Sequence, residues 1–251
     1  MSRNQQHTPS RSRKHRKRKR GFSFSTFLGI LLIIVALGLL LVNPLKNYLI
    51  QNKTNDIQIS NLTREQIVAN QQKDVSFDFT DIQSVDPFTV ISSSVNPKDL
   101  PVIGGISIPE LKINLPINKG TSNEGMFFGA GTLSADQKMG ESNYALASHH
   151  MYDQSLLFSP LKDAKKGQKI FMTDLDNVYV YEISSVLVVD PSAVEVLNPS
   201  SEPIVTLVTC TQDFVDRIIV QGELKEKVPI SEATIEMMDA FKIERKIATN
   251  S

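Results

Sequence analysis

The chain has 251 residues, enough for one sizeable domain with an appendage or for two small domains. Its hydrophobic content of 41 %, with 12 glycines and 12 prolines, excludes a fibrous or wholly disordered protein. The formal net charge of zero hides an asymmetry, because residues 1–20 hold nine Lys/Arg and no acid. The rest of the chain is therefore acidic, and its single cysteine excludes an internal disulfide.

A long apolar segment follows the basic residues. Residues 22–42 carry no charge and no polar stripe, and about 20 helical residues suffice to cross a bilayer. Because Lys and Arg favour the cytoplasmic side, we expect a single-pass membrane protein with its N-terminus in the cytoplasm and its body outside. A cleaved signal peptide is the alternative, but no small-x-small cleavage site follows the segment. Next to such an anchor, the basic arm is not expected to bind nucleic acid.

These features divide the chain into five expected parts. They are a basic cytoplasmic segment (1–21), a transmembrane signal-anchor (22–42), an extracellular stem (43–80), a β-domain (81–228) and a C-terminal tail that reads as helical (229–251). Within the stem, Thr63 and Gln66 have the spacing of a helix-capping box. We expect this short polar helix to act as a spacer and not as part of a core.

The β-domain shows short apolar runs separated by turn residues. Seven or more strands with little helix predict one all-β barrel or sandwich of about 130 residues. Helix is expected only at Leu156–Lys165 and Glu232–Lys246. The expected strands are Val102–Ile108, Lys112–Asn118, Tyr144–Ser148, Gln168–Thr173, Val178–Val189, Ile204–Thr209 and Arg217–Leu224.

Cys210 lies directly after one of these strands. By itself it could be a small buried hydrophobic residue, as most free cysteines are. Two other rare residue types lie at strand ends of the same domain, namely the adjacent His149 and His150, and Arg217. A hairpin between Cys210 and Arg217 would place both at the same end of neighbouring strands. Taken singly, the histidines could be surface residues, and Arg217 could pair with Asp213 or Asp216.

Together, these residues supply what acyl transfer through a thiol requires. A thiolate is the nucleophile, an imidazole exchanges its proton, and a guanidinium holds a carbonyl or a developing oxyanion. Successive strand residues point to opposite faces, so only one of the two histidines is expected to face a given groove. No acidic residue is identifiable from the sequence as a third, orienting group.

The motifs around these residues resemble those of sortases. Residues 206–210 (TLVTC) match the TLxTC signature, residues 146–149 (LASH) are similar to the segment that carries the family histidine, and Arg217 stands at the position of the family arginine. The resemblance covers roughly residues 80–228 and is greatest to the class A (housekeeping) sortases of streptococci. It implies an eight-stranded sortase-type β-barrel with short helices, preceded by the transmembrane helix.

The resemblance also implies a function. A class A sortase cleaves an LPxTG-type sorting signal between Thr and Gly through a thioacyl-enzyme and transfers the surface protein to an amino group of a peptidoglycan precursor (lipid II type). It implies Cys210 as nucleophile, His149 as general acid/base and Arg217 as oxyanion-binding or substrate-positioning group. Ala147, Ser148, Val208 and Thr209 would bind substrate, His150 would be a helper or a bystander, and we expect neither metal nor cofactor.

The sequence departs from the family pattern in three places. Ser148 replaces the commoner glycine, and the loop between Cys210 and Arg217 is about one residue short. Residues 86–88 (DPF) resemble the lid tripeptide of class C sortases, which polymerise pilins, so a class C-like enzyme is one alternative. A non-catalytic membrane-anchored adhesin or receptor with a buried Cys210 is another. An L,D-transpeptidase would need His, Gly and Cys close together in one motif, which is absent.

Overall fold

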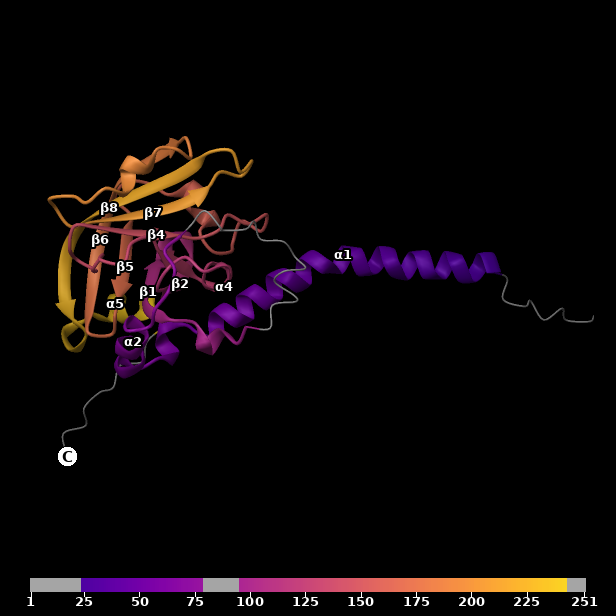
Figure 1. The fold of residues 1–251 in the computed structure, drawn as a ribbon, viewed down its shortest axis with the longest axis horizontal. Helices are drawn as coiled ribbons and strands as arrows, with labels where there is room; N and C mark the ends of the chain where they lie inside the picture. Colours follow the sequence, from indigo (N-terminus) through magenta and orange to yellow (C-terminus); the bar gives the residue numbers. More distant parts are fainter. Residues whose placement is uncertain (1–23, 79–94, 243–251) are drawn as a thin grey trace, which may run out of the picture. The chain divides into compact units, whose positions relative to one another are not determined.

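The computed structural model describes residues 24–78 and 95–242 and divides the chain into two compact units, residues 1–41 and 42–251 (Figure 1). The long helix α1 (Phe24–Asp56) belongs to both. Among the described residues it is the one helix long and apolar enough to cross a membrane, judged by length and composition. It is therefore the candidate membrane anchor, as the sequence predicts.

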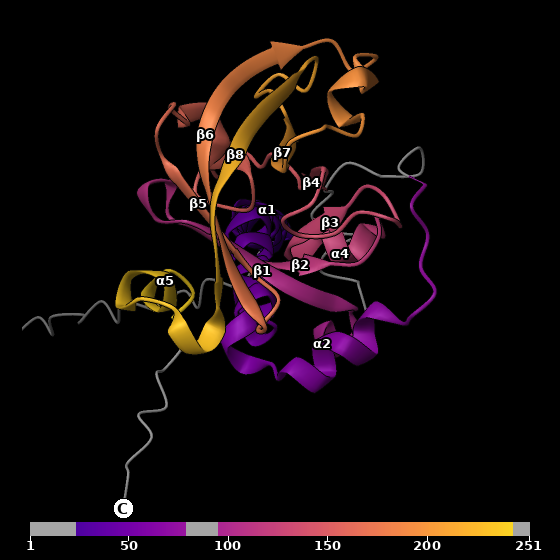
Figure 2. The ribbon, with the colours of Figure 1, turned by 90° about the vertical axis from the view of Figure 1, so that its left-hand side faces the viewer.

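The second unit is built around a closed barrel of eight strands. Around the barrel the order is β1-β2-β3-β4-β7-β8-β6-β5, so β1 and β5 close the ring (Figure 2). The pairs β2/β3 and β4/β7 are parallel, and the others are antiparallel. The strands are β1 (Val102–Ile108), β2 (Ile113–Asn118), β3 (Ala130–Thr132), β4 (Asn143–Ala147), β5 (Lys169–Thr173), β6 (Asn177–Val189), β7 (Ile204–Cys210) and β8 (Arg217–Pro229).

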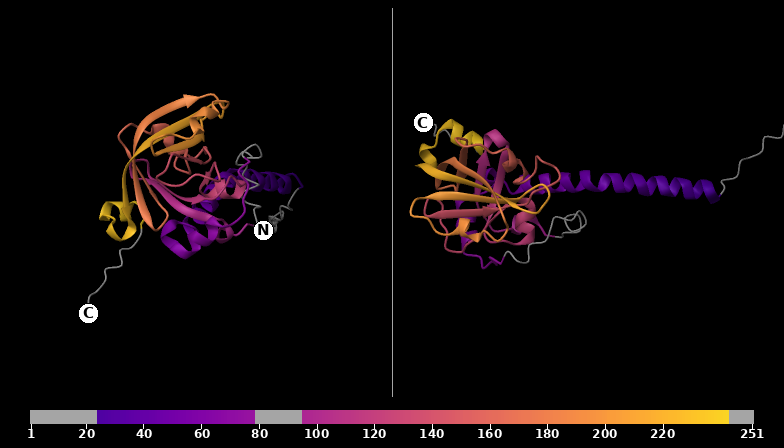
Figure 3. Two further views of the ribbon diagram at one scale, coloured as in Figure 1. Left: turned by 60° about the vertical axis from the view of Figure 1, so that its left-hand side comes forward. Right: turned by 90° about the horizontal axis from the view of Figure 1, so that it is seen from above.

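The seven expected strands are confirmed, and their ends differ by a few residues at most except at β8. That strand continues to Pro229, because it pairs with β6 along nearly the whole length of both (Figure 3). Strand β3 was not predicted. It has only three residues, contains Gly131, and exists through its pairing with β2 and β4, which lie apart from it in the sequence.

Alternation along β7 separates the barrel interior from the outer face. Val205 and Leu207 are fully buried in the main apolar core. Because successive side chains on a strand point to opposite faces, Thr206, Val208 and Cys210 lie on the other face. The apolar positions of β7 thus fix the face on which the cysteine lies.

The segment that precedes the barrel packs against it. Helix α2 (Arg64–Gln71) begins with the predicted capping box, in which Thr63 and Gln66 bind each other's backbone. However, Ile67 is fully buried, and the Asn70 side chain donates to the Val102 carbonyl at 2.9 Å. The expectation of a spacer helix is therefore wrong, because Ile67 joins a buried apolar cluster with Phe171 of β5 and Val178 of β6.

The expected helix at Leu156–Lys165 is also wrong. That segment contains only a 3₁₀-helix, η4 (Ser159–Asp163), because Pro160 can start but not continue a longer helix. The helix expected at Glu232–Lys246 is present only as the short α5 (Ile235–Ala240) among the described residues. The residues beyond Lys242 lie outside the described range, as do residues 86–88. The other short elements are η1 (Ile59–Asn61), η2 (Pro97–Asp99), η3 (Pro109–Leu111), α4 (Asn123–Phe128), η5 (Val194–Leu197) and η6 (Ile230–Glu232).

Candidate active site

Cys210 and Arg217 form the last residue pair of the β7–β8 ladder. They lie directly opposite each other in the antiparallel register. Directly opposed residues share a face and have their Cβ atoms about 5 Å apart. The prediction that a hairpin brings these two side chains together is therefore confirmed.

The parallel pairing of β4 with β7 brings the histidines to the same place. Ala147 pairs with Val208, and beyond the strand the Ser148 N–H donates to the Val208 carbonyl at 3.2 Å. The Thr209 hydroxyl in turn donates to the Ser148 carbonyl at 2.9 Å. These bonds hold the chain in register up to the residue before His149, next to the end of β7.

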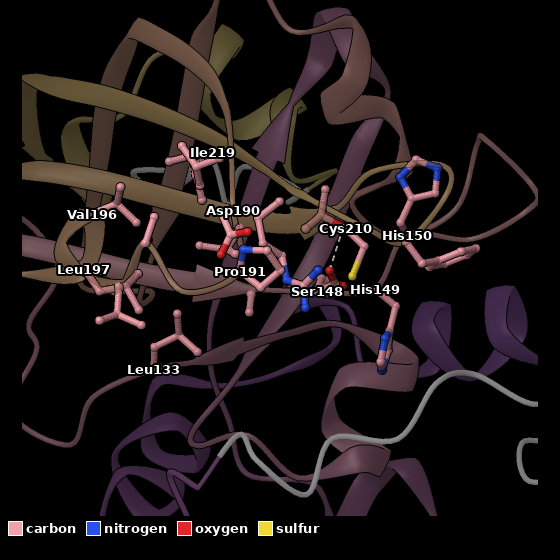
Figure 4. Close-up of a pocket in the computed structure, with 18 of the residues that line it drawn as sticks. Leu133, Ser148, His149, His150, Asp190, Pro191, Val196, Leu197, Cys210 and Ile219 are labelled. Carbon is pink, nitrogen blue, oxygen red and sulfur yellow. Dashed lines mark hydrogen bonds between the residues drawn. The ribbon is translucent and has the colours of Figure 1, made fainter.

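A cavity of about 350 Å³ opens on this outer face of the barrel (Figure 4). Its floor is formed by the ends of β4, β7 and β8, and the connection between β6 and β7 covers the end remote from Cys210. That remote end is mostly apolar. The lining residues are Met126, Leu133, Ala147, Ser148, His149, His150, Val189, Asp190, Pro191, Ala193, Val194, Val196, Leu197, Val208, Thr209, Cys210, Phe214, Arg217 and Ile219.

The four residues expected to bind substrate all line this cavity. Two of them also have structural bonds. Thr209 is 3 % exposed and uses its hydroxyl to hold Ser148. The Ser148 hydroxyl is buried and donates to the Gly129 carbonyl at 2.7 Å. The serine that replaces the family glycine thus ties the histidine segment to the residue after α4.

Both histidines line the cavity, but their rings point away from each other, with the Cys210 sulfur between them in the view of Figure 4. The His149 ring packs on Phe127 at 5.7 Å between ring centroids. The His150 ring meets the edge of Phe214 at 6.1 Å, and its Nε2 lies 3.3 Å from the Gln154 amide nitrogen. The expectation that only one of the two histidines faces a given groove is therefore wrong, because β4 ends at Ala147 and strand alternation does not extend to residues 149 and 150.

Burial controls the protonation of both rings. It lowers the pKa of His149 to about 4, because the charged imidazolium loses its hydration. Burial also lowers the pKa of His150, helped by the Lys162 ammonium, while the Cys210 backbone carbonyl acts in the opposite direction. Both histidines are therefore neutral at pH 7, and His149 is the more strongly held in that form.

Arg217 lines the cavity and makes no carboxylate ion pair among the described residues. Its guanidinium donates to the Asp216 backbone carbonyl at 3.1 Å. The Asp213 carboxylate instead accepts from the Thr211 hydroxyl and the Val215 N–H, which folds the β7–β8 loop. Hydrogen bonds from Ser192 lower the pKa of Asp190, and the charge of Arg217 contributes less. Among the described residues, Arg217 thus forms no ion pair with the carboxylate of Asp213 or Asp216.

Sequence reasoning missed two parts of the site. The β6–β7 connection, including Asp190 and η5, lines the cavity although nothing in its sequence marks it. Phe127 and Phe214 pack on the two histidines, and their spacing in the chain offers no signal because the contacts are tertiary. Within the described ranges, no three or more His, Cys, Asp or Glu side chains are grouped so as to hold a metal ion.

Comparison with known proteins identifies this arrangement. The family model described as "Sortase domain" matches residues 106–225. The chain is 40 % identical to Sortase A of Streptococcus agalactiae, over 90 % of this chain and 96 % of that protein. The chain belongs to the sortase family. A second Sortase A, from Listeria monocytogenes, is 36 % identical over 78 % of this chain and 90 % of its own length.

A solved sortase structure agrees with the fold. The crystal structure of Listeria monocytogenes sortase A matches with a TM-score of 0.53 at 36 % identity, covering 57 % of this chain and 99 % of that one. The similarity to proteins named Sortase A places this chain in class A. It is accordingly a sortase-type cysteine transpeptidase, and its eight-stranded barrel is the sortase barrel.

Proposed function

We propose that this sortase cleaves an LPxTG-type sorting signal between Thr and Gly and joins the surface protein to a peptidoglycan amino group. The observation that carries the proposal is the position of Cys210, which pairs with Arg217 and lines a cavity whose other end is apolar. An extended peptide whose Leu and Pro occupy the apolar end would present its Thr–Gly bond to the sulfur. The apolar side chains of η5 and Ile219 suit such residues.

In the proposed reaction, Cys210 is the nucleophile and His149 the general acid/base. His149 is neutral at pH 7, and its buried Nε2 has no hydrogen-bond partner among the described residues, so it can accept the thiol proton. The sulfur attacks the threonine carbonyl, and the Arg217 guanidinium stabilises the oxyanion. His149 then returns the proton to the departing glycine nitrogen, which leaves a thioester between threonine and Cys210.

The second half of the reaction regenerates the enzyme. The amine of a lipid II-type precursor attacks the thioester, and His149 takes a proton from the attacking amine. His149 passes this proton to the Cys210 sulfur as the sulfur leaves. Threonine is then joined to the acceptor by an amide bond. Ala147, Ser148, Val208 and Thr209 would line the substrate groove, and His150 would assist or stand by.

The proposed location fits this chemistry. The apolar part of α1 would cross the cell membrane once, with the basic residues 1–21 in the cytoplasm and the catalytic unit outside. The sorting signal, the lipid-linked acceptor and the enzyme would then meet at the outer membrane face. Residues 43–80 would be extracellular, and no nucleic acid is involved.

A turnover experiment tests the proposal. The full-length enzyme in detergent micelles should split an LPETG-containing peptide between Thr and Gly and, with an added oligoglycine amine, form the ligated product. Cys210→Ala should show neither reaction while keeping the circular dichroism spectrum of the wild type. Cleavage by Cys210→Ala at the wild-type rate, or failure of the folded wild type to cleave any LPxTG variant, would refute the proposal.

The alternative of a non-catalytic adhesin requires a buried structural cysteine. Cys210 is instead partly exposed and lines the cavity. A thiol reagent should therefore label the native protein within minutes. A thiol that reacts only after unfolding would favour the adhesin.

A further inference from the structure

The His149 ring is oriented without a visible polar partner. Its Nε2 makes no hydrogen bond to the described residues, and burial is the cause that lowers its pKa. Catalytic imidazoles are commonly oriented by a third, hydrogen-bonded group such as a carboxylate. A base that transfers protons to and from Cys210 still needs a fixed direction, so its orientation must come from packing.

Phe127 supplies this packing. Its ring lies 5.7 Å from the His149 ring, with 32° between the two planes, and the residue is 1 % exposed. Offset aromatic pairs at such separations are attractive beyond the area that they bury. Phe127 does not line the cavity, whereas its neighbour Met126 does. The phenyl ring therefore acts on His149 from behind and does not reach the substrate groove.

Helix α4, which carries Phe127, is itself held rigidly. Ser122 caps the helix by accepting from the Gly125 N–H at 3.1 Å. The Asn118 side chain on β2 donates to the Gly125 carbonyl at 2.8 Å. Phe128 packs edge-on against Phe127 at 6.3 Å and is fully buried. A rigid phenyl ring can restrict the motion of the imidazole that packs on it.

A second connection links the same segments through the backbone. The Ser148 hydroxyl donates to the carbonyl of Gly129, the residue that follows α4. The residue before His149 is thus fixed to the segment that carries Phe127. On the other side, the Phe158 N–H donates to the His149 carbonyl at 3.3 Å. The backbone and the ring of His149 are both positioned relative to α4.

We propose that Phe127 is a positioning residue for the reaction, which holds the His149 imidazole in the orientation needed for proton exchange with Cys210. The role is taken by an aromatic side chain in place of a carboxylate. The proposal rests on the catalytic role proposed above for His149. It assigns to Phe127 an effect on the chemical step, and no effect on substrate binding, since the residue lies outside the cavity.

Two leucine variants of the full-length enzyme test this role. Phe127→Leu removes the ring behind His149, and Phe128→Leu makes the same change one position further along in the same core. For Phe127→Leu we expect kcat to fall about tenfold or more with KM unchanged, because a displacement of about 1 Å in a catalytic group can cost about 100-fold. For Phe128→Leu we expect less than about a threefold fall, provided that both variants show cooperative unfolding.

A spectroscopic readout separates positioning from general destabilisation. In histidine-selectively ¹³C-labelled protein, the His149 ring protons should carry a ring-current shift from Phe127, with the resonance assigned by its loss in His149→Gln. The shift should vanish in Phe127→Leu and persist in Phe128→Leu. Phe127→Met, whose flexible side chain adapts to the space left by the ring, should behave as Phe127→Leu and provides a second variant if leucine prevents folding.

The outcomes distinguish this proposal from the proposed function. If the folded Phe127 variants keep wild-type kcat, or lose no more than Phe128→Leu, Phe127 has no positioning role, whatever His149 does. If His149→Gln itself keeps normal turnover, the catalytic role of His149 fails first. Loss of activity in His149→Gln with normal kcat in Phe127→Leu would therefore overturn this inference alone.

Discussion

The largely buried His149 ring predicts that acid destabilises the protein in a defined pH range. Burial lowers the pKa of this histidine from its ordinary value of about 6.5 to about 4. Between these two values the unfolded chain binds a proton at His149 that the folded chain does not. The stabilisation is therefore complete above about pH 6.5 and is lost as the pH falls towards 4.

The magnitude follows from the two pKa values. Between pH 7 and pH 5, His149 should reduce the free energy of unfolding by about 2 kcal/mol. This is an upper value, because the side chain is partly exposed and keeps some hydration. Burial also lowers the pKa of His150, so this residue adds to the loss of stability in acid. A hydrogen bond to the Cys210 backbone carbonyl offsets part of that lowering.

The variant His149→Gln isolates this contribution. Urea unfolding of the full-length wild type and variant in detergent micelles is measured at pH 7 and at pH 5. The comparison shows how strongly the free energy of unfolding depends on pH in each protein. We expect the wild type to lose about 1–2 kcal/mol more than the variant over this range. His150→Gln is the matched control and should remove a smaller part of the dependence. Identical losses in the wild type and His149→Gln, or a measured pKa of His149 at or above 6.5, would refute the reasoning.

Three further substitutions give separate predictions. Arg217→Lys keeps the charge but loses the planar fork of donors, so kcat for LPxTG peptide cleavage should fall about 100-fold with the fold intact. A rate within twofold of wild type would show that a positive charge alone is enough for this step. Ser148→Gly restores the commoner family residue but removes the hydrogen bond to the Gly129 carbonyl, so the free energy of unfolding should fall by about 1–2 kcal/mol in a thermal unfolding assay. An unchanged unfolding midpoint would show that this hydrogen bond does not stabilise the fold. Thr63→Ala breaks the α2 capping box and should cost about 1 kcal/mol in the same assay, whereas no change would mean that α2 does not unfold together with the barrel.

The strand pattern and the pairing of Cys210 with Arg217 could be predicted because local signals specify them. Apolar runs bounded by turn residues mark seven of the eight strands, and the short loop before Arg217 permits only a hairpin with β7. The capping box of Thr63 and Gln66 likewise predicts where α2 begins. Each of these features depends on residues close together in the chain.

The errors have the opposite origin. Strand β3 has three residues and depends on partners supplied by β2 and β4, so no local pattern announces it. The burial of Ile67 depends on residues of β5, β6 and α5, which lie far from it in the sequence. The covering of the cavity by η5 and the packing of Phe127 behind His149 are also long-range contacts. The meeting of Cys210, Arg217 and the two histidines at one cavity could thus be predicted from rare residue types, but the packing around them could not.

Mass spectrometry of a trapped intermediate tests the central claim most directly. The full-length enzyme is mixed with an LPETG peptide in the absence of an amine acceptor, quenched in acid and digested. We predict a thioester that ends at threonine, carried by the peptide that contains Cys210. An adduct on another residue, an adduct that retains glycine, or cleavage without any adduct when hydrolysis of the intermediate is slow would contradict the account.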